Sequence, residues 1–180
     1  MARKRQEGNR FFRMDADFFS DRKIKILKAR YGADGIVLYL YLLCEIYKTG
    51  YYLQVDDDFE YIISDDLNME GNKVKQVLNF LLERSLFDDT LFQSDKVLTS
   101  AGIQRRYQAM VKARATKTPI TAERFWLLSE EETETFIKVN PSLNSSEKKS
   151  GFSEKNEDNS KKNNIKGKEK KKEYIDIDTA

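Results

Sequence analysis

Apolar residues near the start of the chain recur at the spacing of a helix. Ile24, Leu27 and Tyr31 would lie along one face of that helix. Ser20 or Asp21 is suited to cap its start, and Gly32 is suited to end it. The sequence therefore predicts a first amphipathic helix between these capping signals.

A second helix is predicted from Asp34, its cap, to Gly50, because residues 36–47 are apolar except for Glu45. A helix without a polar face must be enclosed by other helices or by a partner subunit. Cys44 lies within this run and is interpreted as a small core residue, since no base is available to activate the thiol. The excess of apolar surface also indicates self-association, without a stoichiometry.

Residues 51–55 predict a short strand, and two further helices follow it. Asp56 or Asp57 can cap the first of these helices, whose apolar side is formed by Phe59, Ile62, Ile63 and Leu67. The next helix, residues 72–84, follows a turn and has the strongest periodic signal of the chain, with Val74, Val77, Leu78, Leu81 and Leu82 on one face. Two helices joined by so short a turn predict a helix-turn-helix.

Short β-prone runs follow the helix-turn-helix. Residues 90–93 and 97–99 flank a polar turn at residues 94–96, which predicts a β-hairpin. A hairpin directly behind a helix-turn-helix is the layout of a winged helix, and the hairpin would be its wing. Thr99 or Ser100 would then cap a helix whose positions include Ile103, Tyr107, Met110, Val111 and Arg114.

The remaining residues before Pro141 predict a short helical extension over residues 119–140. Ser129 and Glu132 match a capping box for a last short helix that carries Phe136 and Ile137, and Trp126 is expected to anchor this piece on the core. The predicted fold class is therefore mostly α with a small β-hairpin. We expect residues 1–118 to form a winged helix-turn-helix that binds DNA, followed by C-terminal helices.

Residues 141–180 differ from the rest in composition. These forty residues contain ten Lys, eight acidic residues, six Ser and five Asn, but only seven apolar residues. Too little apolar surface is present to offset the entropy of ordering such a segment. We expect it to be a disordered tail rich in Lys, Glu, Ser and Asn.

Among the 180 residues there is no His and a single Cys. The lack of His excludes His-dependent triads, imidazole metal sites and a His general base. One Cys excludes a disulfide framework and Cys-based zinc sites. The acidic residues 56–60 lack the spacing of a calcium loop, and residues 71–73 lack that of a phosphate-binding loop. We therefore expect no cofactor, no metal and no enzymatic activity.

The net charge of +2 hides a strong segregation of charge along the chain. Residues 22–30 contain five basic residues and no acid, whereas residues 56–70 contain seven acids and no base. Residues 104–118 are again basic without an acid. Blocks of this size can give a nearly neutral protein one strongly positive side. We expect the acidic run, residues 56–70, to lie on the side away from any bound duplex.

The polar face of the helix at residues 72–84 offers suitable chemistry for reading DNA. It carries Asn72, Lys75, Gln76, Asn79 and Glu83. Amide side chains can pair with the edge of adenine, Lys can reach guanine or phosphate, and the second helix of a helix-turn-helix is the one that enters the major groove. The expected phosphate anchors are Lys73 beside this face, Lys96 at the wing tip, and Arg105 and Arg106 after the wing. The alternative for the two arginines is pairing with the acidic run.

Four stretches of the sequence also carry a resemblance to a known family: residues 11–28, residues 31–52, residues 86–107 with their Arg105-Arg106-Tyr107 ending, and residues 126–139. They resemble the N-terminal winged-helix domain of phage-type replication initiators, or replisome organisers, of Gram-positive bacteria, which are DnaD-like. The resemblance implies a DNA-binding role in replication initiation, with double-stranded DNA and other replication proteins as partners. It supplies no base-contacting residues. Family members continue through a linker like residues 141–173 into a second helical domain, whose functions are not assigned to a chain that stops at Ala180.

Two other functions stay open. A protein-interaction or oligomerisation module of a replication complex would use the apolar second helix, because a fold does not fix a function. A winged-helix transcriptional regulator would use the same fold at other DNA sites. Residues 2–5 after Met1 are not followed by an apolar segment, which argues against a signal peptide. Since a bilayer span needs about twenty apolar residues, we expect a cytoplasmic protein without membrane contact.

Overall fold

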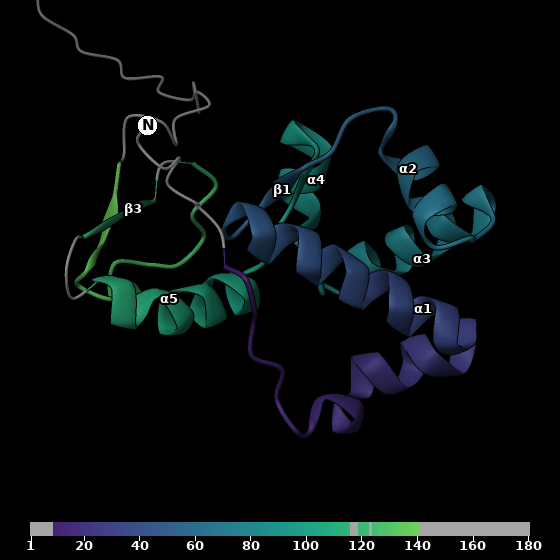
Figure 1. Cartoon of the computed structure of the whole chain (residues 1–180), viewed down its shortest axis with the longest axis horizontal. Helices are drawn as coiled ribbons and strands as arrows, with labels where there is room; N and C mark the ends of the chain where they lie inside the picture. The colour runs from purple at the N-terminus through teal and green to yellow at the C-terminus, as the bar shows by residue number, and fades with distance from the viewer. Residues whose placement is uncertain (1–8, 116–118, 123, 141–180) are drawn as a thin grey trace, which may run out of the picture. The chain divides into compact units, whose positions relative to one another are not determined.

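The computed structural model describes residues 9–115, 119–122 and 124–140 (Figure 1). This part is mostly α-helical with two small two-stranded sheets. In chain order the elements are η1 (Phe18–Ser20), α1 (Arg22–Thr49), β1 (Leu53–Gln54), α2 (Phe59–Asp66), α3 (Gly71–Glu83), α4 (Asp89–Asp95), β2 (Val97–Leu98), α5 (Ala101–Ala115), β3 (Ile120–Ala122) and β4 (Ile137–Val139). No helix among the described residues is both long enough and apolar enough to span a bilayer. The predicted tail, residues 141–180, lies outside the described residues.

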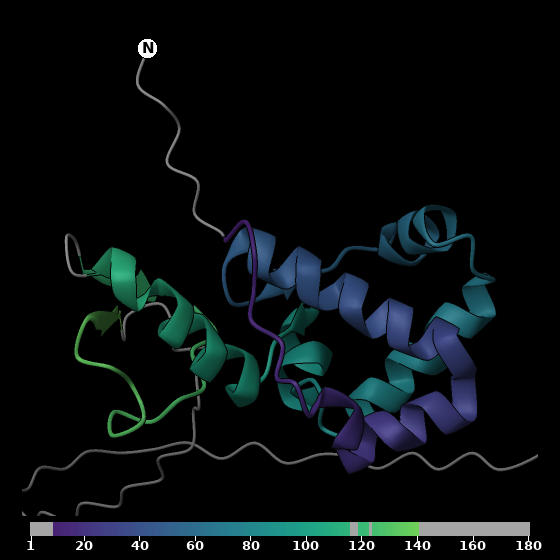
Figure 2. The ribbon, with the colours of Figure 1, turned by 60° about the horizontal axis from the view of Figure 1, so that its bottom comes forward.

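The first two predicted helices are two halves of α1, joined at a bend. Asp21 caps the first half, as predicted, because its Oδ1 accepts hydrogen bonds from the backbone N–H groups of Lys23 (2.6 Å) and Ile24 (3.3 Å). Gly32 has φ 65° and ψ −147°, a conformation that residues with a side chain rarely adopt. The helical conformation is therefore interrupted at Gly32, where the sequence predicted the end of the first helix. Figures 1 and 2 both show the change of direction in α1.

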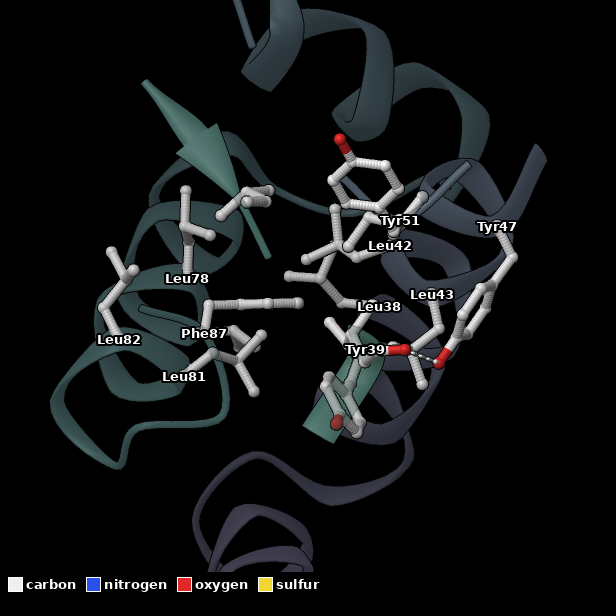
Figure 3. Close-up of a cluster of buried hydrophobic side chains, with 14 of the residues drawn as sticks. Leu38, Tyr39, Leu42, Leu43, Tyr47, Tyr51, Leu78, Leu81, Leu82 and Phe87 are labelled. Atoms are coloured by element: carbon white, nitrogen blue, oxygen red, sulfur yellow. Dashed lines mark hydrogen bonds between the residues drawn. The ribbon is translucent and has the colours of Figure 1, made fainter. Parts of the chain in front are cut away.

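The core lies between the second half of α1 and α3. All five apolar positions predicted for α3 are buried, and Phe80 is buried with them at 1% exposure. Figure 3 shows Leu38 and Leu42 of α1 on one side and Leu78, Leu81 and Phe87 on the other, with Phe87 reaching toward α1. Burying a side chain of this size stabilises the fold by about 1.5–3 kcal/mol. This core fixes which face of α3 points outward.

Cys44 is exposed, so its interpretation as a core residue is wrong. Leu43, the residue before Cys44, and Tyr47 are both buried. Each residue of a helix is rotated by about 100° from the one before it. This rotation places Cys44 on the solvent-exposed face of α1, together with Val37 (45% exposed) and Lys48. The sequence did not predict this exposed face, because apolar residues occupy it as well as the buried face.

The helix-turn-helix arrangement is present as α2, the turn at residues 67–70, and α3. Two details of α2 differ from the prediction. Its N-cap position is Asp58, without a side-chain capping bond, so the predicted caps Asp56 and Asp57 are wrong. Ile63 is the buried residue of α2, whereas the adjacent Ile62 is 52% exposed. Only one side of this eight-residue helix packs against the core, so Ile62 points away from it.

The predicted β-hairpin is wrong. Residues 89–95 form α4, and β2 pairs antiparallel with the distant β1, with Leu53 opposite Leu98. Local capping favours the helix: Asp88 Oδ1 accepts from the backbone N–H of Leu91 (2.9 Å), and Lys96 ends the helix in the left-handed region at φ 55°. The small β-hairpin of the predicted fold class is thus replaced by a sheet between segments more than forty residues apart.

The C-terminal piece is also different from the prediction. Ser129 and Glu132 make the capping-box contacts, with the Glu132 N–H donating to Ser129 Oγ at 3.3 Å, but only a turn follows. In place of the expected last helix, Ile137 begins β4, which pairs in parallel with β3. Trp126 does anchor this piece, as predicted: it is 8% exposed, and its ring packs edge-on against Tyr51 at 5.0 Å.

Of the two residues predicted to cap the start of α5, Thr99 and Ser100, the structure shows Ser100 in this role. The Ser100 hydroxyl accepts from the backbone N–H of Ile103 at 3.4 Å, so Ser100 is the capping residue. Thr99 is fully buried, and its hydroxyl donates instead to the backbone oxygen of Tyr51 at 2.7 Å. Gln104 continues this buried network: it donates to Phe125 O (2.7 Å) and accepts from the Leu127 N–H (2.6 Å). These bonds join α5 to the C-terminal piece.

Candidate nucleic-acid interface

The outward face of α3 carries the three predicted amides. Asn72, Gln76 and Asn79 are all exposed, because the opposite face of the helix is fully occupied by the core. Asn72 Nδ2 donates to Glu70 Oε1 at 3.3 Å. The three positions are spaced by helical turns, so their side chains share one strip of surface. The structure therefore brings these three predicted site residues together.

Lys73 and Lys75 flank this strip on its two sides, and each is paired with an acid. Lys73 Nζ contacts Asp34 Oδ2 of α1, and Lys75 Nζ lies 3.0 Å from Glu60 Oε2 of α2. Exposed ion pairs of this kind contribute only about 0–1 kcal/mol. The pairing of Lys75 with Glu60 also places part of the acidic run beside α3. The expectation that residues 56–70 lie on the side away from any bound duplex stays a prediction.

Arg105 and Arg106 have other partners than those expected. Both are exposed, and neither pairs with residues 56–70. Arg105 donates from Nη2 and Nε to Glu132 Oε1 at 2.6 and 3.2 Å, which holds the pKa of that carboxyl below its usual range. Arg106 Nη2 lies 3.4 Å from Asp15 Oδ2. Their acidic partners belong to segments that the sequence did not connect with them.

Arg106 also lines a cavity of about 370 Å³ between α1, α5 and the segment before α1. The stacked rings of Phe12 and Tyr47 and the carboxyls of Asp15 and Asp17 lie in its wall. Burial raises the pKa of Tyr47 to about 12. Leu86, just beyond the C-terminal end of α3, is part of the lining, whereas Asn72 lies at the opposite end of that helix. Arg106 thus occupies a cavity of mixed charge, apart from the start of the amide strip.

Lys96 was predicted at the tip of a wing, and the structure places it at the junction of α4 and β2. Its Nζ lies 5.1 Å from the centre of the Phe92 ring. Since residues 89–95 are helical, the hairpin that would have carried Lys96 to a DNA backbone is absent from the described residues. Lys96 stays a predicted contact, but without the wing that motivated it.

Three basic residues outside the predicted site gather between α1 and the end of α3. The guanidinium groups of Arg30 and Arg84 lie 5.5 and 5.6 Å from the centre of the Phe80 ring, and Lys23 Nζ donates to Ser85 O at 3.1 Å. We call these three residues the α1–α3 basic cluster. The acid-free run of residues 22–30 was a signal for two of them. Arg84 lies outside that run but follows Phe80 by four residues, so helical spacing places it beside the ring, and the fold brings Arg30 there from α1.

Comparison with known proteins places the chain in a family. The model of the family described as Lin1244/Lin1753-like, N-terminal, matches residues 11–103, just over half of the chain. The chain belongs to the Lin1244/Lin1753-like family. A curated relative, the "Uncharacterized phage-related protein Lin1244/Lin1753" of Listeria innocua, is 30% identical over 114 residues, which are 63% of this chain and 37% of the relative. The chain thus spans little more than a third of that protein's length. No solved structure matches the chain.

The family match covers a defined part of the fold. Residues 11–103 include α1, the helix-turn-helix and β2, and they end in the first turn of α5. The amide strip of α3 and the α1–α3 basic cluster therefore lie within the family's N-terminal region. Arg105 and Arg106 lie just beyond it.

Proposed function

We propose that this protein binds duplex DNA without a catalytic step, with α3 in the major groove. The observation that carries this proposal is the amide strip of Asn72, Gln76 and Asn79 on the second helix of the helix-turn-helix. A major groove about 12 Å wide admits one helix, and amide side chains match the donor and acceptor pattern of adenine. The buried residues on the other side of α3 hold the strip in a fixed orientation.

The order of the elements supports the same proposal. In chain order come α1, β1, α2, α3, α4 and β2, and β1 pairs with β2. A winged helix would have this order with a strand in the place of α4. The finer proposal is thus a winged-helix relative that uses no hairpin. Lys73 and Lys75 would exchange their weak ion pairs for phosphate contacts, because a charge-assisted bond to phosphate is at least as strong.

The role we propose is replication initiation in a phage or mobile element. The relative's name supports the phage connection, and the resemblance to replisome organisers supports replication. Such a protein acts in the cytoplasm, with double-stranded DNA and other replication proteins as partners. A transcriptional regulator of the same fold would differ in the DNA sites that it selects.

A titration of the full chain against fluorescently labelled duplexes over a series of salt concentrations tests this function. The logarithm of the affinity should fall by about 0.9 for each phosphate contact per decade of salt. Replacing Asn72, Gln76 and Asn79 together with Ala should weaken binding and reduce discrimination between duplex sequences. Gln93→Ala is the matched control, since Gln93 is an exposed amide on α4. Absence of binding even at low salt would refute the function.

A second candidate, self-association, is favoured by a specific observation. Tyr61 and Ile62 of α2 and Val37 of α1 are large apolar side chains that are 76%, 52% and 45% exposed. Tyr41 Oη donates to Asp66 Oδ2 at 2.5 Å, which joins α1 to α2 in this region. A second copy of the chain could cover these residues. Light scattering of the protein and of a Tyr61→Glu, Ile62→Glu variant would show a fall in mass if it does.

A further inference from the structure

We propose that the α1–α3 basic cluster, Lys23, Arg30 and Arg84, is a phosphate-binding surface for the nucleic-acid backbone. This inference rests on the proposed function and names the groups that anchor the duplex beside α3. Its ligand is the phosphodiester, so it would contribute affinity without reading base sequence. It takes the anchoring role that the sequence analysis gave to Arg105 and Arg106.

The positive charges of Arg30 and Arg84 converge on one aromatic ring. Because Arg30 and Arg84 lie 5.5 and 5.6 Å from the same ring centre, their guanidinium carbons are no more than about 11 Å apart. Lys23 lies near them, because its Nζ donates to the backbone oxygen of Ser85, the residue directly after Arg84. A DNA duplex carries one negative charge about every 1.7 Å of its axis, so several phosphates fall within such a span. A converging cationic group of this size matches that density of anions.

The cluster also differs from the other predicted cations in its ion pairing. In the described residues no carboxylate forms an ion pair with Lys23, Arg30 or Arg84, whereas Lys73, Lys75, Arg105 and Arg106 each have one. A paired cation must give up its acid before it can bind phosphate, and its field is already partly neutralised. The three residues of the cluster have no such exchange to make. Lys25 and Lys28, exposed on the same half of α1, add to the positive field.

Phe80 preorganises the two guanidinium groups. The ring is 1% exposed, and the Tyr31 ring packs edge-on against it at 5.6 Å, so its position is fixed by the core. A guanidinium over an aromatic face is attracted by the ring, and its N–H groups stay free to donate in its own plane. Holding both arginines in this way lowers the entropy lost when they bind phosphate.

Tyr31 connects the cluster with the amide strip. Arg30 also lies over the Tyr31 ring at 5.9 Å, and the Tyr31 hydroxyl donates to the backbone oxygen of Gln76 at 3.3 Å. Gln76 belongs to the strip itself, and Phe80 follows it by one helical turn. The cluster therefore borders the strip on the α1 side. A duplex seated on α3 would present one strand's phosphates to Arg30 and Arg84.

The test is the salt dependence of duplex binding by the full chain carrying Arg30→Gln and Arg84→Gln. If both residues contact phosphate, the salt slope should fall by about two, and affinity at low salt by about tenfold per residue. The loss should be equal for duplexes of different sequence. The matched control is Lys112→Gln with Lys138→Gln, which removes two exposed positive charges from α5 and β4. An equal change in the control would overturn the inference, because it would reflect net charge alone.

Two further variants keep the result interpretable. Arg30→Lys with Arg84→Lys keeps the charge but loses the planar donor fork, so it should retain most of the salt slope. Lys23→Gln removes one cation without touching Phe80, and should lower the slope by about one even if the arginine variant folds poorly. If wild-type protein and the amide-strip variant differ in binding but the cluster variants match their control, the cluster inference is wrong and the proposed function stands. If wild-type protein binds no duplex, the function itself is wrong.

Discussion

Replacing Gly32 with Ala should destabilise the protein through the backbone alone. Gly32 has φ 65° and ψ −147°, a region that is populated almost only by Gly and costs other residues about 1–3 kcal/mol. A Cβ added at this position would meet no atom within 4 Å, so crowding contributes nothing. Ala also restricts the unfolded chain, which offsets about 0.4–1 kcal/mol of the cost. The expected net loss is about 1–2 kcal/mol of unfolding free energy.

Urea unfolding followed by far-UV circular dichroism measures this loss, and two other glycines supply controls. At Gly71 an added Cβ also meets no atom within 4 Å, but the backbone is not in the positive-φ region, so Gly71→Ala should be neutral or stabilising. At Gly35 the added Cβ would lie 2.8 Å from Tyr31 Cβ, so Gly35→Ala should cost about 1–3 kcal/mol by overpacking. A Gly32→Ala protein as stable as the wild type would mean that the bend of α1 does not depend on this backbone conformation.

Three further outcomes are expected. Gln104→Leu should cost about 1–3 kcal/mol in the same unfolding assay, because it removes the partners of the part-buried backbone groups of Phe125 and Leu127; a neutral effect would contradict this network. Since burial raises the pKa of Tyr47 to about 12, its neutral form is favoured in the fold, and stability should be complete below pH 10 and fall between pH 10 and about 12. Tyr47→Phe should reduce that fall, and an unchanged pH profile would refute the assignment. Cys44 should react with a thiol reagent in the folded protein without denaturant, as its exposure requires, whereas slow reaction limited by unfolding would restore the core interpretation.

The sequence predicted best those elements whose signals are local and whose partners are close. The periodicity of α3, the cap at Asp21 and the interruption of the helix at Gly32 depend on neighbouring residues, and all three are found in the structure. The hairpin failed because residues 90–93 are β-prone in isolation but are capped as a helix by Asp88. Their expected neighbour, β2, pairs instead with β1, and a pairing between residues 53 and 98 leaves no local pattern to detect.

The candidate site divides in the same way. Helical spacing alone was sufficient to place Asn72, Gln76 and Asn79 on one exposed strip. The electrostatic partners could not be predicted, since the ion pair of Arg105 with Glu132 and that of Arg106 with Asp15 join segments far apart in the sequence. Arg84 entered no charge cluster along the chain, yet the fold brings Arg30 to the same Phe80 ring that Arg84 contacts. Counting charges along a sequence identifies cations but not which of them keep their charge unpaired.

That distinction decides how a chain with a net charge of only +2 can hold a polyanion. The acidic residues are not kept away from the amide strip, because Glu60 and Asp34 pair with the lysines on its two flanks. A duplex on α3 must therefore displace or tolerate these carboxylates, which favours a contact that is anchored elsewhere. The α1–α3 basic cluster meets that requirement, since its cations are unpaired in the described structure and border the strip through Tyr31 and Gln76. Binding that draws on these few contacts should be moderate in affinity and steeply salt-dependent, in contrast to the indiscriminate binding of a uniformly basic protein.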